Sequence, residues 1–256
     1  MNKQLFFLVA APRSGNTVFA SIMNQNPEIA CTANSITLEV LKDIDFLKTS
    51  DIFFNYPDHN SLDNVLKSVF DNYYKDWPQK YIIDRNPVTT PGNLKLMKNY
   101  FQRPFKCIIL VRDLLDILAS YIKWYSENPN AFLNKIANTD EEKLLKLMSK
   151  TGTIAKDLEA IKNANNYPEM CHLIKYNDMV SKPEQVFSDL YRFLGIKLFK
   201  HSFQNLKQLE VNGICYDDTI VGNNMHTIKT ELKKQPNPYY HRIPKRFIKE
   251  YGHIKF

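Results

Sequence analysis

The stretch Pro12–Thr17, PRSGNT, has the composition of an anion-binding turn between a strand and a helix. It follows the apolar run Leu5–Val9, whose length suits a strand buried on both faces. Pro12 interrupts strand pairing, and Gly15 permits backbone angles that other residues resist. If a helix begins here, its first backbone N–H groups are unpaired, and Arg13 and the hydroxyls of the turn add further donors. The turn therefore favours a phosphate-like or sulfate-like group.

This turn is not the phosphate loop of ordinary ATP and GTP sites. That loop has the pattern Gly-x-x-x-x-Gly-Lys-Ser/Thr, whereas PRSGNT contains one glycine and no lysine. The same residue types also occur in strand-to-helix turns that bind nothing. Taken alone, the turn leaves both anion binding and a simple chain reversal open, and the other strand ends must decide between them.

A second arginine stands at the end of another apolar run. Arg112 follows the run 106–111, and Ser120 comes later in a segment of helical pattern, 114–125. This spacing places Ser120 about two turns into the helix, within reach of the same oxygen cluster as Arg112. Taken alone, Ser120 also fits a small residue packed against the sheet. Two arginines and the turn together indicate a ligand with more than one anionic group.

Alternating apolar runs and helical segments predict the elements that position these side chains. We expect strands at four apolar runs, 5–10, 80–84, 106–111 and 171–176. Helical patterns lie at 37–48, 61–75, 114–125, 140–163 and 183–194, with Ser61 as a possible N-cap of the second. Such alternation predicts one α/β domain with a parallel sheet of four to five strands and helices on its faces. Ligands of such sheets bind beyond the carboxyl ends of the strands, where Arg13, Arg85, Arg112 and Tyr176 all fall.

Composition excludes several classes of protein. The 256 residues carry a net charge of +7, but no dense basic block appears, so we do not expect nucleic acid as a partner. No apolar stretch is long enough to cross a membrane, and the short apolar N-terminus ends in Pro12 rather than in a cleavage site. The cysteines are too far apart for a zinc site or a disulfide framework; they are Cys31, Cys107, Cys171 and Cys215. We therefore expect a soluble, cytoplasmic protein without a metal site.

Four motifs in order resemble those of the sulfotransferases that use 3′-phosphoadenosine 5′-phosphosulfate (PAPS). PRSGNT is similar to the family's 5′-phosphosulfate loop, and VRDLLDILAS, which contains Arg112 and Ser120, is similar to its 3′-phosphate motif. DRNP and YNDMVSKPEQVFSDLYRFLGI resemble two further family segments, and VGNNMH is placed like the late loop that closes over the nucleotide. The resemblance runs from Leu5 to about residue 226 and leans toward bacterial, viral and tyrosylprotein-type members.

The resemblance implies a fold, a reaction and a set of site residues. The fold is a three-layer, P-loop-type domain over 1–256, with a core at about 5–200 and a nucleotide-covering loop and surface tail at 201–256. The reaction moves a sulfuryl group from PAPS to a hydroxyl or amine of a small molecule, glycan or tyrosine, leaves 3′,5′-ADP and needs no metal. The implied nucleotide-binding residues are Arg13, Ser14, Gly15, Asn16, Thr17, Arg112, Ser120, Tyr176, Gly222 and Asn223.

The catalytic residues implied by the resemblance are Arg13 and Arg85, which would stabilise the leaving oxygen, and a general base. Glu39 is the main candidate for that base, because related enzymes place a glutamate or histidine soon after the first helix. Glu28 is a weaker candidate, and His59 and His226 are other possibilities.

Two other functions stay open at this point. The first is a nucleotide or small-molecule kinase with a degenerate phosphate loop, which would need ATP and magnesium. The second is a non-catalytic basic protein that binds nucleic acid or a polysulfated glycan, which predicts charged patches rather than arginines that point into a pocket. The missing lysine of the phosphate loop, together with Arg112 and Ser120, argues against the kinase.

Overall fold

A parallel sheet of five strands in the order β2-β3-β1-β4-β5 forms the centre of the computed structural model, which describes residues 3–220, 224–234 and 236–254. The strands are β1 (Gln4–Ala10), β2 (Ile29–Cys31), β3 (Tyr81–Arg85), β4 (Cys107–Val111) and β5 (Cys171–Lys175). The expected α/β fold is confirmed, and Leu5–Val9 lies in the central strand. The short strand β2 is the one that no apolar run predicted.

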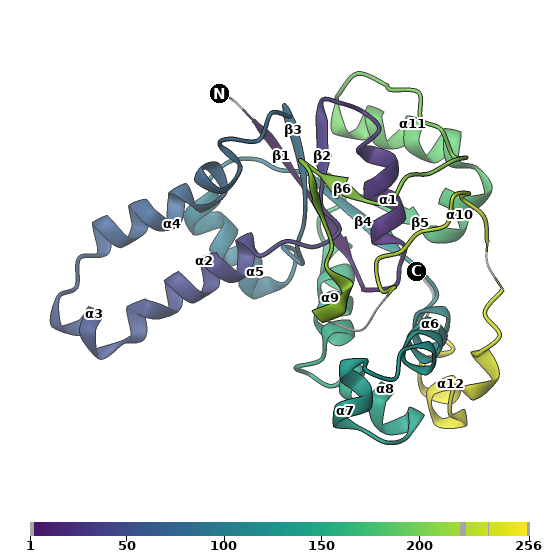
Figure 1. Ribbon diagram of the computed structural model, residues 1–256. Coiled ribbons are helices and arrows are strands. Elements are labelled where there is room, and N and C mark those ends of the chain that lie inside the picture. The colour runs from purple at the N-terminus through teal and green to yellow at the C-terminus, as the bar shows by residue number, and fades with distance from the viewer. Residues whose placement is uncertain (1–2, 221–223, 235, 255–256) are drawn as a thin grey trace.

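Helices cover both faces of this sheet and give three layers (Figure 1). Side chains alternate along β1, so Phe6 and Leu8 face one layer while Phe7 and Val9 face the other. The first layer contains α1 (Asn16–Met23), α10 (Tyr176–Ser181) and α11 (Pro183–Leu194). The second contains α4 (His59–Tyr74), α5 (Pro91–Leu96), α6 (Leu114–Glu127), α7 (Phe132–Ile136), α8 (Asp140–Met148) and α9 (Thr153–Ala164).

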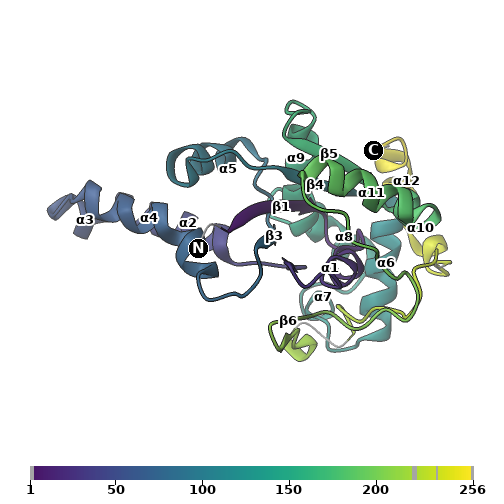
Figure 2. The same ribbon diagram turned by 90° about the horizontal axis from the view of Figure 1, so that it is seen from above.

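A helical arm projects from one side of the domain (Figures 1 and 2). It consists of α2 (Thr37–Phe46), a 3-10 turn at Leu47–Thr49, α3 (Asp51–Asn55) and the first part of α4. The N-cap of α4 is Asp58, whose carboxylate accepts the backbone N–H of Ser61. Ser61 is therefore not the cap that the sequence suggested, because the helix begins at His59, three residues before the first apolar residue of its pattern, Leu62.

The chain after α11 adds a small two-stranded sheet and a final helix. Strands β6 (Glu210–Val211) and β7 (Ile214–Cys215) form an antiparallel hairpin, and α12 (Lys245–Tyr251) packs against α6. Phe247 of α12 is 1% exposed and belongs to the core beneath α6. This segment therefore contributes to the core as well as to the surface. Among the described residues, no helix combines the length and apolar character needed to span a bilayer.

Candidate functional site

The turn after β1 has the backbone geometry of an anion-binding concavity. Arg13 has a φ of 66° and Gly15 a φ of 99°, both in the left-handed region. Gly15 is the N-cap of α1, so the first backbone N–H groups of that helix have no acceptor within the helix. A Cβ atom on Gly15 would lie 2.8 Å from two ring carbons of Tyr176, which explains why a glycine stands here.

Arg13 joins this turn to the predicted 3′-phosphate motif. Its Nε donates to Oγ of Ser120 at 3.1 Å, and its Nη1 donates to the carbonyl oxygen of Met225 at 2.6 Å. Burial lowers the pKa of Arg13, and the charge of Arg112 acts in the same direction, whereas Tyr121 and Asp218 oppose it. The structure therefore brings two motifs that are 107 residues apart into one site.

Arg112 lies against the same turn. Its Nη1 donates to the carbonyl oxygen of Arg13 at 3.0 Å, and its guanidinium lies over the ring of Tyr176, 4.6 Å from the centroid. A carboxylate oxygen of Asp116 lies 3.9 Å from its Nε. These contacts confirm that the ends of β1, β4 and β5 meet at one edge of the sheet, as parallel strands require.

Arg85, the last residue of β3, approaches the turn from the other side. Its Nη2 donates to the carbonyl oxygen of Ala10 and to a carboxylate oxygen of Asp157 on α9, both at 2.6 Å. Its backbone N–H donates to Oγ1 of Thr32 at 3.0 Å. Burial raises the pKa of Asp157, and Arg85 opposes that rise. The ion pair, with side chains 13% and 6% exposed, holds Arg85 beside the end of β1.

Unpartnered polar atoms gather at these residues. In the described part of the chain, six buried side-chain atoms have no hydrogen-bond partner. Four of them belong to predicted site residues: Oγ of Ser14, Oδ1 of Asn16, Nε of Arg85 and Nε of Arg112. Three of these four are donors. Buried donors without partners are costly in a folded protein, so their concentration here indicates a ligand that accepts hydrogen bonds.

The late segment of the chain also reaches the site, through the contact between Met225 and Arg13. Within this segment, Nδ1 of His226 lies 2.5 Å from Asp218, and the ring of Tyr216 stacks on the imidazole. Gly222 and Asn223, two of the predicted nucleotide-binding residues, lie outside the residues that the structure describes.

The remaining predicted residues have different surroundings. Thr17 lies half-buried in the first turn of α1. Glu39, the predicted base, lies on α2 with 62% of its side chain exposed, and its carboxylate accepts a hydrogen bond from Lys42 at 3.0 Å. None of the contacts described for Glu39 connects it to the arginine cluster.

Two site residues escaped the sequence reasoning. Asp157 stands between Ile154, Leu158 and Ile161 on the buried side of α9, so a carboxylate on the apolar face of the helix was the available signal. Tyr121, 2% exposed, comes directly after Ser120 and interacts electrostatically with Arg13 and Arg85. Burial raises its pKa to about 12. Its position in an apolar run made it look like an ordinary core residue.

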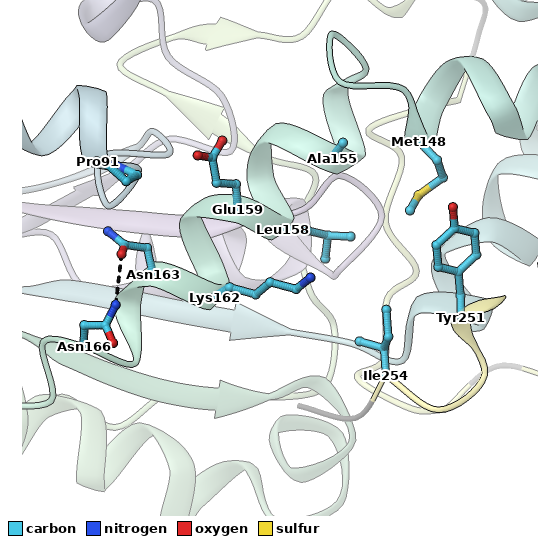
Figure 3. Close-up of a pocket in the computed structure, with 10 residues that line it drawn as sticks. All are labelled: Pro91, Met148, Ala155, Leu158, Glu159, Lys162, Asn163, Asn166, Tyr251 and Ile254. Carbon is cyan, nitrogen blue, oxygen red and sulfur yellow. Dashed lines mark hydrogen bonds between the residues drawn. The ribbon is translucent and has the colours of Figure 1, made fainter.

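A pocket of about 520 Å³ lies elsewhere, along α9 and beside Tyr251 of α12 (Figure 3). Its lining includes Met148, Glu159, Lys162 and Asn163, and none of its ten lining residues is a predicted site residue. The arginine cluster is therefore a separate site. Among the described residues, no group of three histidine, cysteine or acidic side chains is arranged to hold a metal ion.

Solved structures with the same fold are sulfotransferases. The sulfotransferase domain of the curacin biosynthetic pathway is 17% identical over 99% of both chains, with a TM-score of 0.55. A sulfotransferase from Alicyclobacillus acidocaldarius is 16% identical with a TM-score of 0.51, over 79% of this chain and 85% of that one. A mouse sulfotransferase complexed with PAP is 21% identical with a TM-score of 0.50 over 78% of this chain, which spans 60% of the mouse chain.

These structural likenesses show the shared fold, and a sequence model supplies the family. No curated protein matches the chain by sequence. The model of the sulfotransferase family, in contrast, matches residues 6–200, from β1 to the segment after α11. That range contains the turn, the three arginines, Ser120 and Tyr176. The chain belongs to the sulfotransferase family.

Proposed function

We propose that the arginine cluster binds PAPS and that the protein transfers its sulfuryl group to a hydroxyl or amine acceptor. The observation that carries the proposal is the convergence of unpartnered buried donors at the ends of β1, β3 and β4. The complex of PAP with the mouse sulfotransferase of the same fold supports the choice of nucleotide.

The turn and the N-terminus of α1 suit the 5′ end of the nucleotide. The backbone N–H groups after Gly15 and the hydroxyl of Ser14 would donate to the 5′-phosphate oxygens, with Asn16 and Thr17 at the same helix end. Arg112 and Ser120 would hold the 3′-phosphate. The ring of Tyr176, on which Arg112 lies, would contact the adenine end.

Arg13 and Arg85 are placed to stabilise the charge that develops on the leaving oxygen. Transfer of a sulfuryl group resembles phosphoryl transfer, in which positioning and electrostatic stabilisation supply most of the catalysis. The Asp157 carboxylate and the Ala10 carbonyl fix the Arg85 guanidinium without using its Nε. The positive charge of the site comes from arginines, so the proposal has no role for a metal ion.

The proposal treats the chain as one catalytic domain. Its core covers about 5–200, and the later segment, to which Gly222 and Asn223 belong, would cover the nucleotide. The same sequence grounds that predict no membrane span suggest a cytoplasmic enzyme. Glu39 was the base predicted from the sequence, but its exposed carboxylate pairs with Lys42 and has no described contact with the arginine cluster, so the proposed function gives it no role. The acceptor follows from the family only as far as its hydroxyl or amine group.

Isothermal titration separates this function from its alternatives. The protein should bind 3′,5′-ADP more tightly than 5′-AMP, and ATP with magnesium should bind weakly. Tight binding of ATP with magnesium would support the kinase instead. Binding of heparin fragments without binding of 3′,5′-ADP would support the non-catalytic basic protein. Release of 3′,5′-ADP from PAPS, followed by chromatography, then tests turnover directly.

A further inference from the structure

Tyr216, Asp218 and His226 form a second cluster of side chains beside Met225, which contacts Arg13. Nδ1 of His226 lies 2.5 Å from Oδ1 of Asp218, and the backbone N–H of His226 donates to Oδ2 of Asp218 at 2.9 Å. The ring of Tyr216 is stacked on the imidazole, with centroids 4.1 Å apart and an angle of 17° between the planes. The carboxylate and the aromatic ring together fix both the tilt and the rotation of the histidine.

Contacts on both sides hold this cluster at the carboxyl edge of the sheet. The carbonyl oxygen of Met225, the residue before His226, accepts the hydrogen bond from Arg13. Backbone hydrogen bonds from Ala33 and Asn34, directly after β2, act on the phenol of Tyr216. The neighbours of the imidazole, Met225 in the chain and Tyr216 on its face, therefore contact the segments that follow β1 and β2, and Met225 contacts the arginine that we assign to the transferring group.

Asp218 and Tyr216 orient the imidazole so that its Nδ1 faces a carboxylate. Asp218 faces Nδ1, and its charge also acts on Arg13. Tyr216 covers one ring face, and Arg85 interacts electrostatically with its phenol, whose pKa burial raises to about 12. A carboxylate at Nδ1 favours the tautomer with its proton there, which leaves the lone pair on Nε2. The side chains of His226 and Asp218 are 24% and 17% exposed, so the pair is shielded but accessible.

We infer that His226 is the general base that activates the acceptor, and that Asp218 positions it. The inference rests on the proposed function. Nε2 of His226 takes the proton of the acceptor hydroxyl while the acceptor oxygen forms a bond to sulfur. The bond between sulfur and the 5′-phosphate oxygen breaks, and its electron pair leaves with the product nucleotide. Asp218 stabilises the imidazolium that forms, as in other carboxylate–histidine pairs.

Glu39 is the competing candidate, and its surroundings differ. Its carboxylate is 62% exposed and pairs with Lys42 in the same helix, whereas the Asp218–His226 pair is adjacent to a residue that contacts Arg13. Removing a general base typically lowers a rate by about 10²–10⁴-fold. The two candidates therefore predict opposite results in a direct comparison of variants.

Hydrolysis of PAPS, with water as the acceptor, provides that comparison without knowledge of the natural acceptor. His226→Gln should lower the hydrolysis rate by about 10²-fold or more, and Asp218→Asn should lower it less. Glu39→Gln, and His59→Gln on the arm, should leave it unchanged. Affinity for 3′,5′-ADP should stay close to that of the unaltered protein in all four variants. Added imidazole should restore part of the activity of His226→Ala but none of the activity of Arg13→Ala. If His226 had only a structural role, imidazole would restore neither variant.

A normal rate for His226→Gln, or a large loss in Glu39→Gln alone, would overturn the inference. Failure of the unaltered protein to bind 3′,5′-ADP would instead refute the proposed function. Where hydrolysis is too slow to follow, nitrogen NMR of the ring in the 3′,5′-ADP complex decides. His226 should show the tautomer protonated at Nδ1, and Asp218→Asn should shift that equilibrium. The opposite tautomer in the unaltered protein would contradict the assignment.

Discussion

Substitution of Gly15 by alanine should damage nucleotide binding through a side chain that is distant in sequence. Gly15 has a φ of 99°, and a Cβ there would lie 2.8 Å from ring carbons Cδ2 and Cε2 of Tyr176. The same ring lies beneath the guanidinium of Arg112, 4.6 Å from its centroid. Alanine at this position must therefore displace the tyrosine on which the proposed 3′-phosphate ligand rests.

Two contributions set the size of the effect. An L-residue in the left-handed region costs about 1–2 kcal/mol of folding stability. Loss of the cation–π contact between Arg112 and Tyr176 costs about 0.5–2 kcal/mol. If the lost cation–π energy reduces the free energy of nucleotide binding by the same amount, the affinity for 3′,5′-ADP falls by about 2- to 30-fold, since 1.4 kcal/mol corresponds to a factor of ten.

Gly213 provides a matched control for this substitution. It lies in the turn between β6 and β7 with a φ of 79°, and nothing stands within 4 Å of the place where its Cβ would be. Urea denaturation should therefore show the cost of the left-handed backbone alone for Gly213→Ala and a larger loss of stability for Gly15→Ala. Isothermal titration should show weaker 3′,5′-ADP binding for Gly15→Ala alone. Equal affinities in the two variants would refute the role assigned to the Tyr176 ring.

Four further substitutions test the arginines and the buried carboxylates. Arg112→Ala should weaken the binding of 3′,5′-ADP by about 1.5–3 kcal/mol, and the affinity for 5′-AMP should stay nearly unchanged in titrations. An equal loss of affinity for both nucleotides would contradict the 3′-phosphate assignment. Arg13→Ala should lower PAPS turnover by about 10²-fold or more, with a much smaller loss of 3′,5′-ADP affinity. Normal turnover in this variant would mean that the turn only reverses the chain and has no catalytic role. Asp157→Ala should lower unfolding free energy in urea by about 3–5 kcal/mol, because it leaves a buried arginine without its carboxylate, and a loss below 1 kcal/mol would contradict that reasoning. Burial raises the pKa of Asp84 above 3.8, so its contribution to stability is complete below about pH 4 and is lost as the pH rises through the folded-state pKa. Urea denaturation from pH 4 upward should therefore show the unaltered protein losing stability relative to Asp84→Asn, and parallel pH profiles would contradict it.

The sheet was predictable where a strand is long and buried on both faces. Four apolar runs matched β1, β3, β4 and β5, because a continuous apolar stretch has few other uses at that length. The strand β2 contains three residues, Ile29–Cys31, which is too few to show a pattern. The expected helix 140–163 is two helices, since the chain turns between α8 and α9, where Gly152 donates its backbone N–H to Ser149 at 2.7 Å. Apolar periodicity alone did not reveal that turn.

The site was predictable where its residues follow the strands directly. Arg13, Arg85 and Arg112 all stand at strand ends, and parallel strands bring those ends to one edge. The partners that orient them come from elsewhere in the chain. Asp157 pairs with an arginine 72 residues before it, and Met225 accepts from one 212 residues before it. Such pairings depend on how helices and late loops pack, which local sequence patterns do not encode.

The contacts that hold Arg13 and Arg85 explain how these two arginines can be fixed in place and still stabilise a charge. A guanidinium has five N–H donors. The contacts described for Arg13 use two of them, toward Ser120 and Met225, and those described for Arg85 use the two on Nη2. Three donors on each arginine are left for a ligand by these contacts. A lysine has three donors on one nitrogen, so the same fixation would leave a single one for the ligand. Electrostatic catalysis requires donors that are held rigidly and are still available to the ligand. An arginine meets both requirements, which favours arginine at both positions.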